Sequence, residues 1–94
     1  MKLIYDVRGS GKTKRLFEYA QKNNGVIITD NASALRVKAQ AYGYNNIEII
    51  EADRLSSLDI KGKNILIRNL DCFVENYFKI HGATFIGATM TKEG

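Results

Sequence analysis

DVRGSGKT, residues 6–13, stands between a short apolar run and a run of helix-forming residues. Gly9 and Gly11 lack a Cβ, so a bound phosphate can come close to the backbone N–H groups around them. Lys12 adds a positive charge, and Thr13 offers a hydroxyl to a magnesium ion. A helix that starts here points the positive end of its dipole at an anion. The stretch therefore predicts a phosphate-binding loop.

The segments on either side of the loop fit this interpretation. Residues 2–5 are short, apolar and β-prone, which predicts a buried strand. Residues 12–23 predict an amphipathic helix, because its apolar side chains recur on one face. These side chains are Leu16, Phe17 and Ala20. The turn at residues 23–25 ends in glycine and supplies the helix stop.

Four further β-prone runs follow, at residues 26–29, 47–50, 64–67 and 84–88. A second helix is expected before Gly43, with an inner face of Leu35, Ala39 and Tyr42. A third helix is expected to open at Asp71, with an inner face of Val74, Tyr77 and Phe78. Strands that alternate with helices predict an α/β fold in one domain over residues 1–94. We expect a three-layer, mostly parallel sheet of about five strands with helices on both faces.

Composition narrows the class of protein. The chain has 94 residues, of which 45% are hydrophobic, so one core is expected. The net charge of +4 suits an anionic partner, but Lys and Arg are scattered rather than gathered in a block. The single cysteine, Cys72, has no partner for an internal disulfide, and no apolar run reaches the length of a membrane span. These features predict a cytoplasmic protein that does not contact a membrane.

Polar residues follow the expected strands one after another. In open parallel sheets, ligands bind beyond the carboxyl ends of the strands, where such residues meet. We therefore expect one edge of the sheet to collect the phosphate-binding loop together with the residues that follow the later strands. Those residues are Asp30, Glu51, Arg68, Asn69 and Thr89.

Residues 8–13 resemble the Walker A motif of the P-loop NTPases, although the first glycine of the full pattern is Asp6 here. Residues 65–71 and 85–91 are similar to the Walker B strand and the sensor-like strand of small phage ATP-binding proteins and helicase-like cores. The likeness covers nearly the whole chain, and its first motif is the specific one. It implies ATP and Mg²⁺ as cofactors and, for a phage protein, the host cytoplasm. The phosphates would lie among Arg8, Gly9, Ser10, Gly11, Lys12 and Thr13.

This sequence departs from the family pattern at the end of the strand that resembles Walker B, where the family carries carboxylates. Here the chain reads Ile67-Arg68-Asn69, and neither Arg nor Asn can take a proton from water. Asp71 is one candidate for the missing metal and catalytic carboxylate, and a helix N-cap is its other interpretation. Glu51, after another apolar strand, is a second candidate, and a solvated loop residue is its other interpretation. Arg68 either pairs with a phosphate or forms an ion pair with Asp6 or Asp71.

Two functions follow from these residues. The first is an ATP-binding protein whose ATPase activity is weak or depends on a partner, with Lys12 at the β and γ phosphates. The alternative is a module that keeps the fold without catalysis and contacts nucleic acid or a protein. An exposed edge at residues 84–88 would offer a route to a homo-oligomer.

Overall fold

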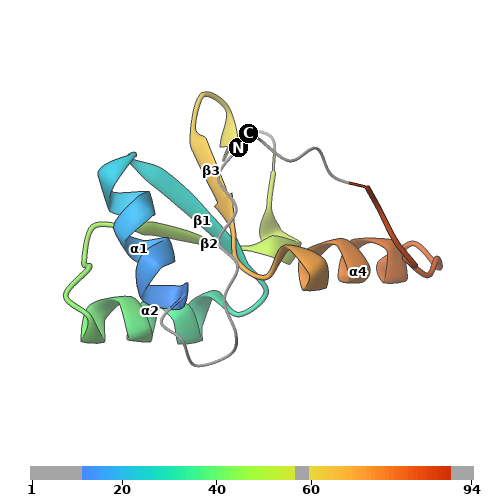
Figure 1. Ribbon diagram of the computed structural model, residues 1–94, viewed down its shortest axis with the longest axis horizontal. Helices are drawn as coiled ribbons and strands as arrows, with labels where there is room; N and C mark the ends of the chain where they lie inside the picture. Colours follow the sequence, from blue (N-terminus) through green and yellow to red (C-terminus); the bar gives the residue numbers. More distant parts are fainter. Residues whose placement is uncertain (1–11, 57–59, 90–94) are drawn as a thin grey trace.

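The structure is a computed structural model, and it describes residues 12–56 and 60–89. Helices and strands alternate along the chain (Figure 1). Their order is α1 (Lys12–Lys22), β1 (Gly25–Thr29), α2 (Ala32–Ala41), β2 (Glu48–Glu51), the 3-10 turn η1 (Ala52–Arg54), β3 (Asn64–Ile67) and α4 (Leu70–Ile80). The strand predicted at residues 2–5 and loop residues 6–11 lie outside the described residues.

The three described strands form a parallel sheet in the order β2-β1-β3. They correspond to the runs predicted at residues 26–29, 47–50 and 64–67, so the α/β class is confirmed. β1 lies between its neighbours, and all five of its residues are buried. A central strand covered on both faces needs an unbroken apolar run, which Val26-Ile27-Ile28 provides.

Helices α1 and α2 pack on the same face of the sheet. The strand register places Ile27 opposite both Ile49 of β2 and Leu66 of β3, so these three side chains share a face. They form one apolar cluster with both helices, which contribute Leu16, Phe17, Ala20, Ala32, Leu35 and Ala39. Helices on both faces were predicted, but the two described helices that cover the sheet lie on one face.

Aromatic and glycine residues set how closely α1 approaches its neighbours. Phe17 is fully buried, and its ring lies 6.1 Å from that of Tyr42 and 5.6 Å from that of Tyr44. Tyr42, predicted on the inner face of α2, is 54% exposed but keeps this ring contact. At Gly25 a Cβ would clash with the side chain of Leu66. The glycine therefore leaves room for the Leu66 side chain beside β1.

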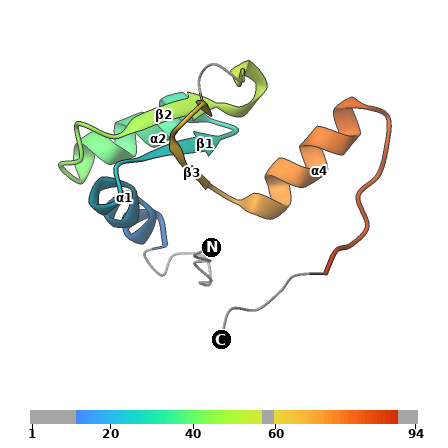
Figure 2. The ribbon, with the colours of Figure 1, turned by 90° about the horizontal axis from the view of Figure 1, so that it is seen from above.

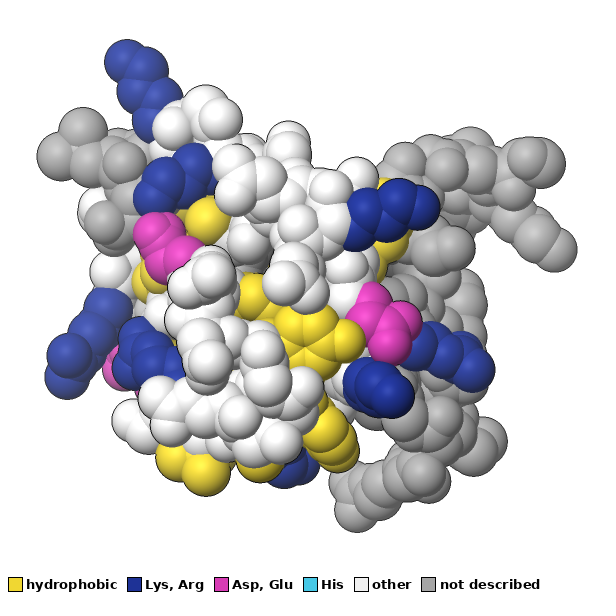
Figure 3. All heavy atoms as spheres, turned by 90° about the vertical axis from the view of Figure 1, so that its left-hand side faces the viewer, with side chains coloured by type: hydrophobic (Ala, Val, Ile, Leu, Met, Phe, Trp, Pro, Cys, Tyr) yellow, Lys and Arg dark blue, Asp and Glu magenta, His cyan; other side chains and the backbone are white. Residues whose placement is uncertain are grey.

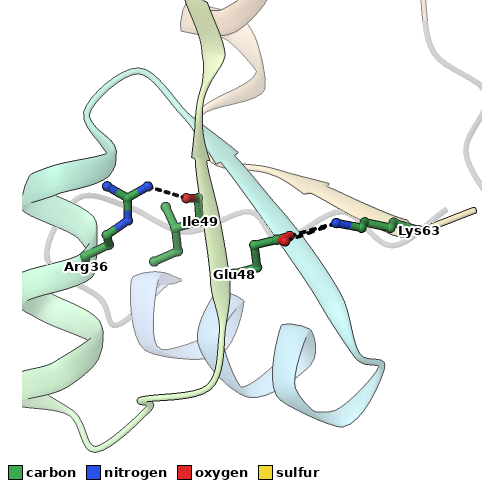
Figure 4. A network of polar contacts seen from close by, with 4 residues as sticks. All are labelled: Arg36, Glu48, Ile49 and Lys63. Atoms are coloured by element: carbon green, nitrogen blue, oxygen red, sulfur yellow. Dashed lines mark hydrogen bonds and ion pairs between the residues drawn. The ribbon is translucent and has the colours of Figure 1, made fainter. Parts of the chain in front are cut away.

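Polar contacts hold the outer strands in register (Figure 4). Arg36 of α2 donates to the Ile49 carbonyl at 2.6 Å, which satisfies an acceptor on the outer edge of β2. Lys63, just before β3, forms an ion pair of 2.9 Å with Glu48 of β2. Because β1 lies between them, this ion pair spans the whole described sheet. The first contact joins β2 to α2, and the second links the ends of the two outer described strands.

Helix α4 leaves the sheet instead of covering it (Figure 2). Asn69 is its N-cap and has a left-handed φ of 56°, which turns the chain away after β3. None of the residues of α4 is buried, and Tyr77 is 54% exposed. The inner face predicted for this helix is therefore wrong. The helix also begins at Leu70, so the interpretation of Asp71 as its N-cap is wrong.

Residues 83–89, which follow α4, do not join the described sheet. They form neither helix nor strand, so the strand predicted at 84–88 is wrong. A crossover helix must run back along the sheet to bring the next strand beside the first, and α4 runs away from it. Phe85 stacks instead on Phe78 of α4, with ring centroids 6.0 Å apart and planes at 6°.

Candidate functional site

The carboxyl ends of the three described strands open onto one cleft of about 340 Å³. Asp30 follows β1, Glu51 ends β2, and Arg68 follows β3, and all three line the cleft. The prediction that polar residues after successive strands gather at one edge is confirmed for these three. Asp53, two residues beyond β2, also lines the cleft. Asn69 and Thr89 were expected with them but are not in its lining.

Helix α4 supplies the opposite wall of the cleft, through Phe73, Asn76, Tyr77, Lys79 and Ile80. Sequence reasoning did not assign these residues to a site, because it placed the apolar side of α4 in the core. The spacing of three and four residues between Phe73, Asn76, Tyr77 and Ile80 does put them on one side of a helix. That pattern identifies the wall once the helix is known to leave the sheet.

Glu51 holds the start of α2 as well as lining the cleft. Its Oε1 accepts a hydrogen bond of 3.2 Å from the backbone N–H of Ala32. The N-cap Asn31 accepts a second bond, of 3.3 Å, from the N–H of Ala34. Free N–H groups at a helix start favour a carboxylate, so Glu51 has a structural role. The role predicted for it in catalysis stays a prediction.

Asp71 lies apart from the cleft lining. It is exposed in the first turn of α4, two residues after the N-cap Asn69. A carboxylate in that turn interacts favourably with the helix dipole. Its predicted roles as a catalytic group and a metal ligand stay predictions.

Arg68 is half-buried beside β3. Its backbone N–H donates to the Ile28 carbonyl at 2.9 Å and so continues the pairing of β3 with β1. Within residues 12–56 and 60–89, its guanidinium forms no ion pair, so the predicted pair with Asp71 is absent. Asp6, the other predicted partner, lies outside the described residues. Arg68 and Lys79 are the cations of the cleft lining.

The start of α1 lies toward the same edge of the sheet. An 11-residue helix is about 16 Å long, and a five-residue strand is about as long. Residues 23–24 join α1 directly to β1, so the helix and the strand run in opposite directions (Figure 1). The first residue of α1 is therefore level with the carboxyl end of β1.

The first turn of α1 is suited to an anion. α1 is described from Lys12, which follows the glycine-rich residues 6–11 in the sequence, and its first described turn contains no acidic residue. Thr13 is half-buried in that turn. Free backbone N–H groups and a positive dipole end are what a phosphate needs at a helix start. A turn of this kind suits an anion, and the Thr13 hydroxyl is an oxygen ligand of the type that magnesium accepts.

Apart from Thr13, the described residues offer few groups that could bind a metal ion. Among them, no group of three or more His, Cys, Asp or Glu side chains is arranged to hold a metal. None of the helices in this part of the chain has the length and apolar character to cross a membrane. On the face shown in Figure 3, basic side chains lie in separate places among acidic and apolar ones rather than in one stripe. That distribution resembles an ordinary solvated surface.

A scan against protein families, a search of curated proteins and a search of solved structures each gave no match to this chain.

Proposed function

We propose that the protein binds a nucleoside triphosphate, ATP with Mg²⁺, through residues 8–13 and the start of α1. The observation that carries the proposal is a helix described from Lys12, directly after the two glycines in the sequence. A glycine loop that leads into a helix start is the structural context in which this motif binds phosphate. In this role Gly9, Ser10 and Gly11 offer backbone N–H groups, Lys12 and Arg8 offer charge, and Thr13 reaches the metal.

The residues favour binding over rapid hydrolysis. Arg68 and Asn69 occupy the positions where the motif would carry carboxylates. One oxygen of Glu51 is already engaged by the start of α2. Water attack on a γ-phosphate needs a group that orients the water and a metal that neutralises charge. Turnover would therefore be slow or would depend on a partner that completes the site.

Calorimetric titration with ATP and Mg²⁺ tests the proposal. Lys12→Ala should weaken ATP binding about tenfold or more, because it removes a charge-assisted hydrogen bond to the phosphates. Lys14→Ala is the matched control: Lys14 is exposed on the same helix, two residues further on, and its loss should change the affinity less than twofold. Absence of heat with the parent protein, or equal losses in the two variants, would contradict nucleotide binding at the loop.

The alternative function is a module that binds nucleic acid or protein without catalysis. Its specific support is Arg68, which brings a cation to the cleft where a catalytic carboxylate was expected. Phosphate release from ATP, followed with and without DNA, separates the two functions. Release that disappears in Lys12→Ala supports an ATPase, whereas DNA binding that weakens with salt and occurs without release supports the module.

A further inference from the structure

The cleft at the carboxyl edge has two chemically different walls. Asp30, Glu51 and Asp53 line it from the strand ends, and Phe73 and Tyr77 line it from α4. Its volume of about 340 Å³ falls within the range of small-molecule sites, roughly 300–1,000 Å³. Acceptors on one side and aromatic rings on the other suit a flat ring that carries hydrogen-bond donors.

Tyr77 is the accessible ring of the aromatic wall. Its side chain is 54% exposed, which leaves ring surface available to a ligand. Phe78 meets it edge-on with centroids 5.3 Å apart and planes at 89°, and His81 lies 4.9 Å away. These contacts restrict the orientation of the Tyr77 ring. Aromatic rings held in this way act as platforms on which nucleobases stack.

Asn76 adds a polar group between the two aromatic side chains in the sequence of α4. Its amide offers one donor group and one acceptor. This combination pairs with an exocyclic amine beside a ring nitrogen, as in adenine N6 and N7. Asp30 and Asp53 add acceptors, and ionised carboxylates accept hydrogen bonds from a base amine such as cytosine N4. Thymine and uracil carry no such amine.

We propose that this cleft binds an amino-bearing nucleobase, adenine, cytosine or guanine, stacked on Tyr77 and bonded by Asn76 and the carboxylates. Arg68 and Lys79 line the same cleft and supply the charge for a phosphate attached to the base. The base comes either from a mononucleotide or from a single strand of nucleic acid. The proposal goes beyond phosphate binding at the loop and does not depend on it.

A single tryptophan provides the test, because the chain contains none. Tyr77→Trp places the reporter in the aromatic wall and retains stacking. Val37→Trp is the control, since Val37 is 66% exposed on α2 and is not in the cleft lining. Adenosine at millimolar concentrations should quench Tyr77→Trp fluorescence to saturation, and uridine should bind at least about fivefold more weakly. Quenching that does not saturate, that is equal for the two nucleosides, or that is matched by Val37→Trp overturns the proposal.

A second substitution tests whether Asn76 contributes to the preference for a base that carries an amine. Asn76 is exposed on a helix, and alanine favours helices, so Asn76→Ala preserves the fold. Combined with Tyr77→Trp, it should weaken adenosine about fivefold or more and reduce the preference for adenosine over uridine. An unchanged preference for adenosine would overturn the assignment of the amine to Asn76 and the neighbouring carboxylates.

Two further titrations identify the source of the base and separate this site from the loop. Tighter, salt-sensitive binding of oligo-dA than of AMP assigns a nucleic-acid strand, and equal binding assigns a mononucleotide. Lys12→Ala combined with Tyr77→Trp should still bind adenosine within twofold, because adenosine carries no phosphate. Loss of adenosine binding in that variant would overturn a separate base site. Loss of ATP binding with adenosine binding retained supports a base site that is separate from the loop.

Discussion

The carboxylate of Glu51 has either a structural role at the start of α2 or a catalytic role, and Glu51→Ala tests which of the two roles it has. The substitution removes the bond from the Ala32 N–H to Oε1 at the start of α2. Charge-assisted bonds to carboxylates are about 2.7–2.9 Å long, whereas this bond is 3.2 Å, so the lower part of the range for capping groups applies. We expect Glu51→Ala to lower the free energy of unfolding by about 1 kcal/mol.

Glu51→Gln keeps an oxygen acceptor and removes only the charge, so its cost should be about 0.3–0.5 kcal/mol. Thermal unfolding followed by circular dichroism measures both effects. A loss of 1 kcal/mol corresponds to a fall of about 4–8 °C in Tm for a domain of this size. Glu75→Ala is the control: Glu75 is exposed on α4 and caps no helix, so Tm should stay within about 2 °C.

A different outcome would refute this reasoning. If Glu51→Ala is as stable as the parent while phosphate release from ATP is lost, Glu51 does not support α2. Its carboxylate would then act on the nucleotide, as predicted from its position after an apolar strand. A loss of stability in Glu51→Ala, with release unchanged in Glu51→Gln, assigns it to the fold alone.

Three further substitutions test the packing and the ion pair. Phe17→Ala removes a fully buried ring between α1 and α2 and should cost about 3–5 kcal/mol in urea unfolding; a cost below 1 kcal/mol would contradict the core described for α1. Gly25→Ala should cost about 1 kcal/mol, because its Cβ meets the terminal methyl of Leu66, which has to turn away, whereas Gly87→Ala, with nothing within 4 Å of its Cβ, should be neutral. Lys63→Ala should cost about 0.5 kcal/mol or less, since the two side chains of the Lys63–Glu48 pair are 40% and 47% exposed, and that cost should shrink in high salt.

Local pattern was sufficient for the three described strands and for half of the site. β1 has an unbroken apolar run, and such a run fits only a strand that is covered on both faces. Parallel strands then bring Asp30, Glu51 and Arg68 to one edge, because each follows its strand by zero or one residue. Their meeting in one cleft was predictable for this reason.

The second half of the site was not predictable from pattern. The apolar side of α4 has the spacing of a core-facing helix, and nothing local distinguishes a helix that covers a sheet from one that leaves it. The left-handed φ at Asn69 makes that difference. Asparagine tolerates this conformation, but whether it adopts it depends on the surrounding chain. The same turn removes the strand predicted at residues 84–88.

The sequence by itself determined the order of helices and strands from α1 to α4 and the place of α1 directly after two glycines of the sequence. Both depend on short-range physics: apolar periodicity, helix caps and the backbone freedom of glycine. Only the tertiary structure decided that α1 and α2 share one face, that Glu51 supports α2, and that α4 closes a cleft with Asn76 and Tyr77. Those contacts join residues far apart in the chain, and their geometry depends on the path of the whole backbone.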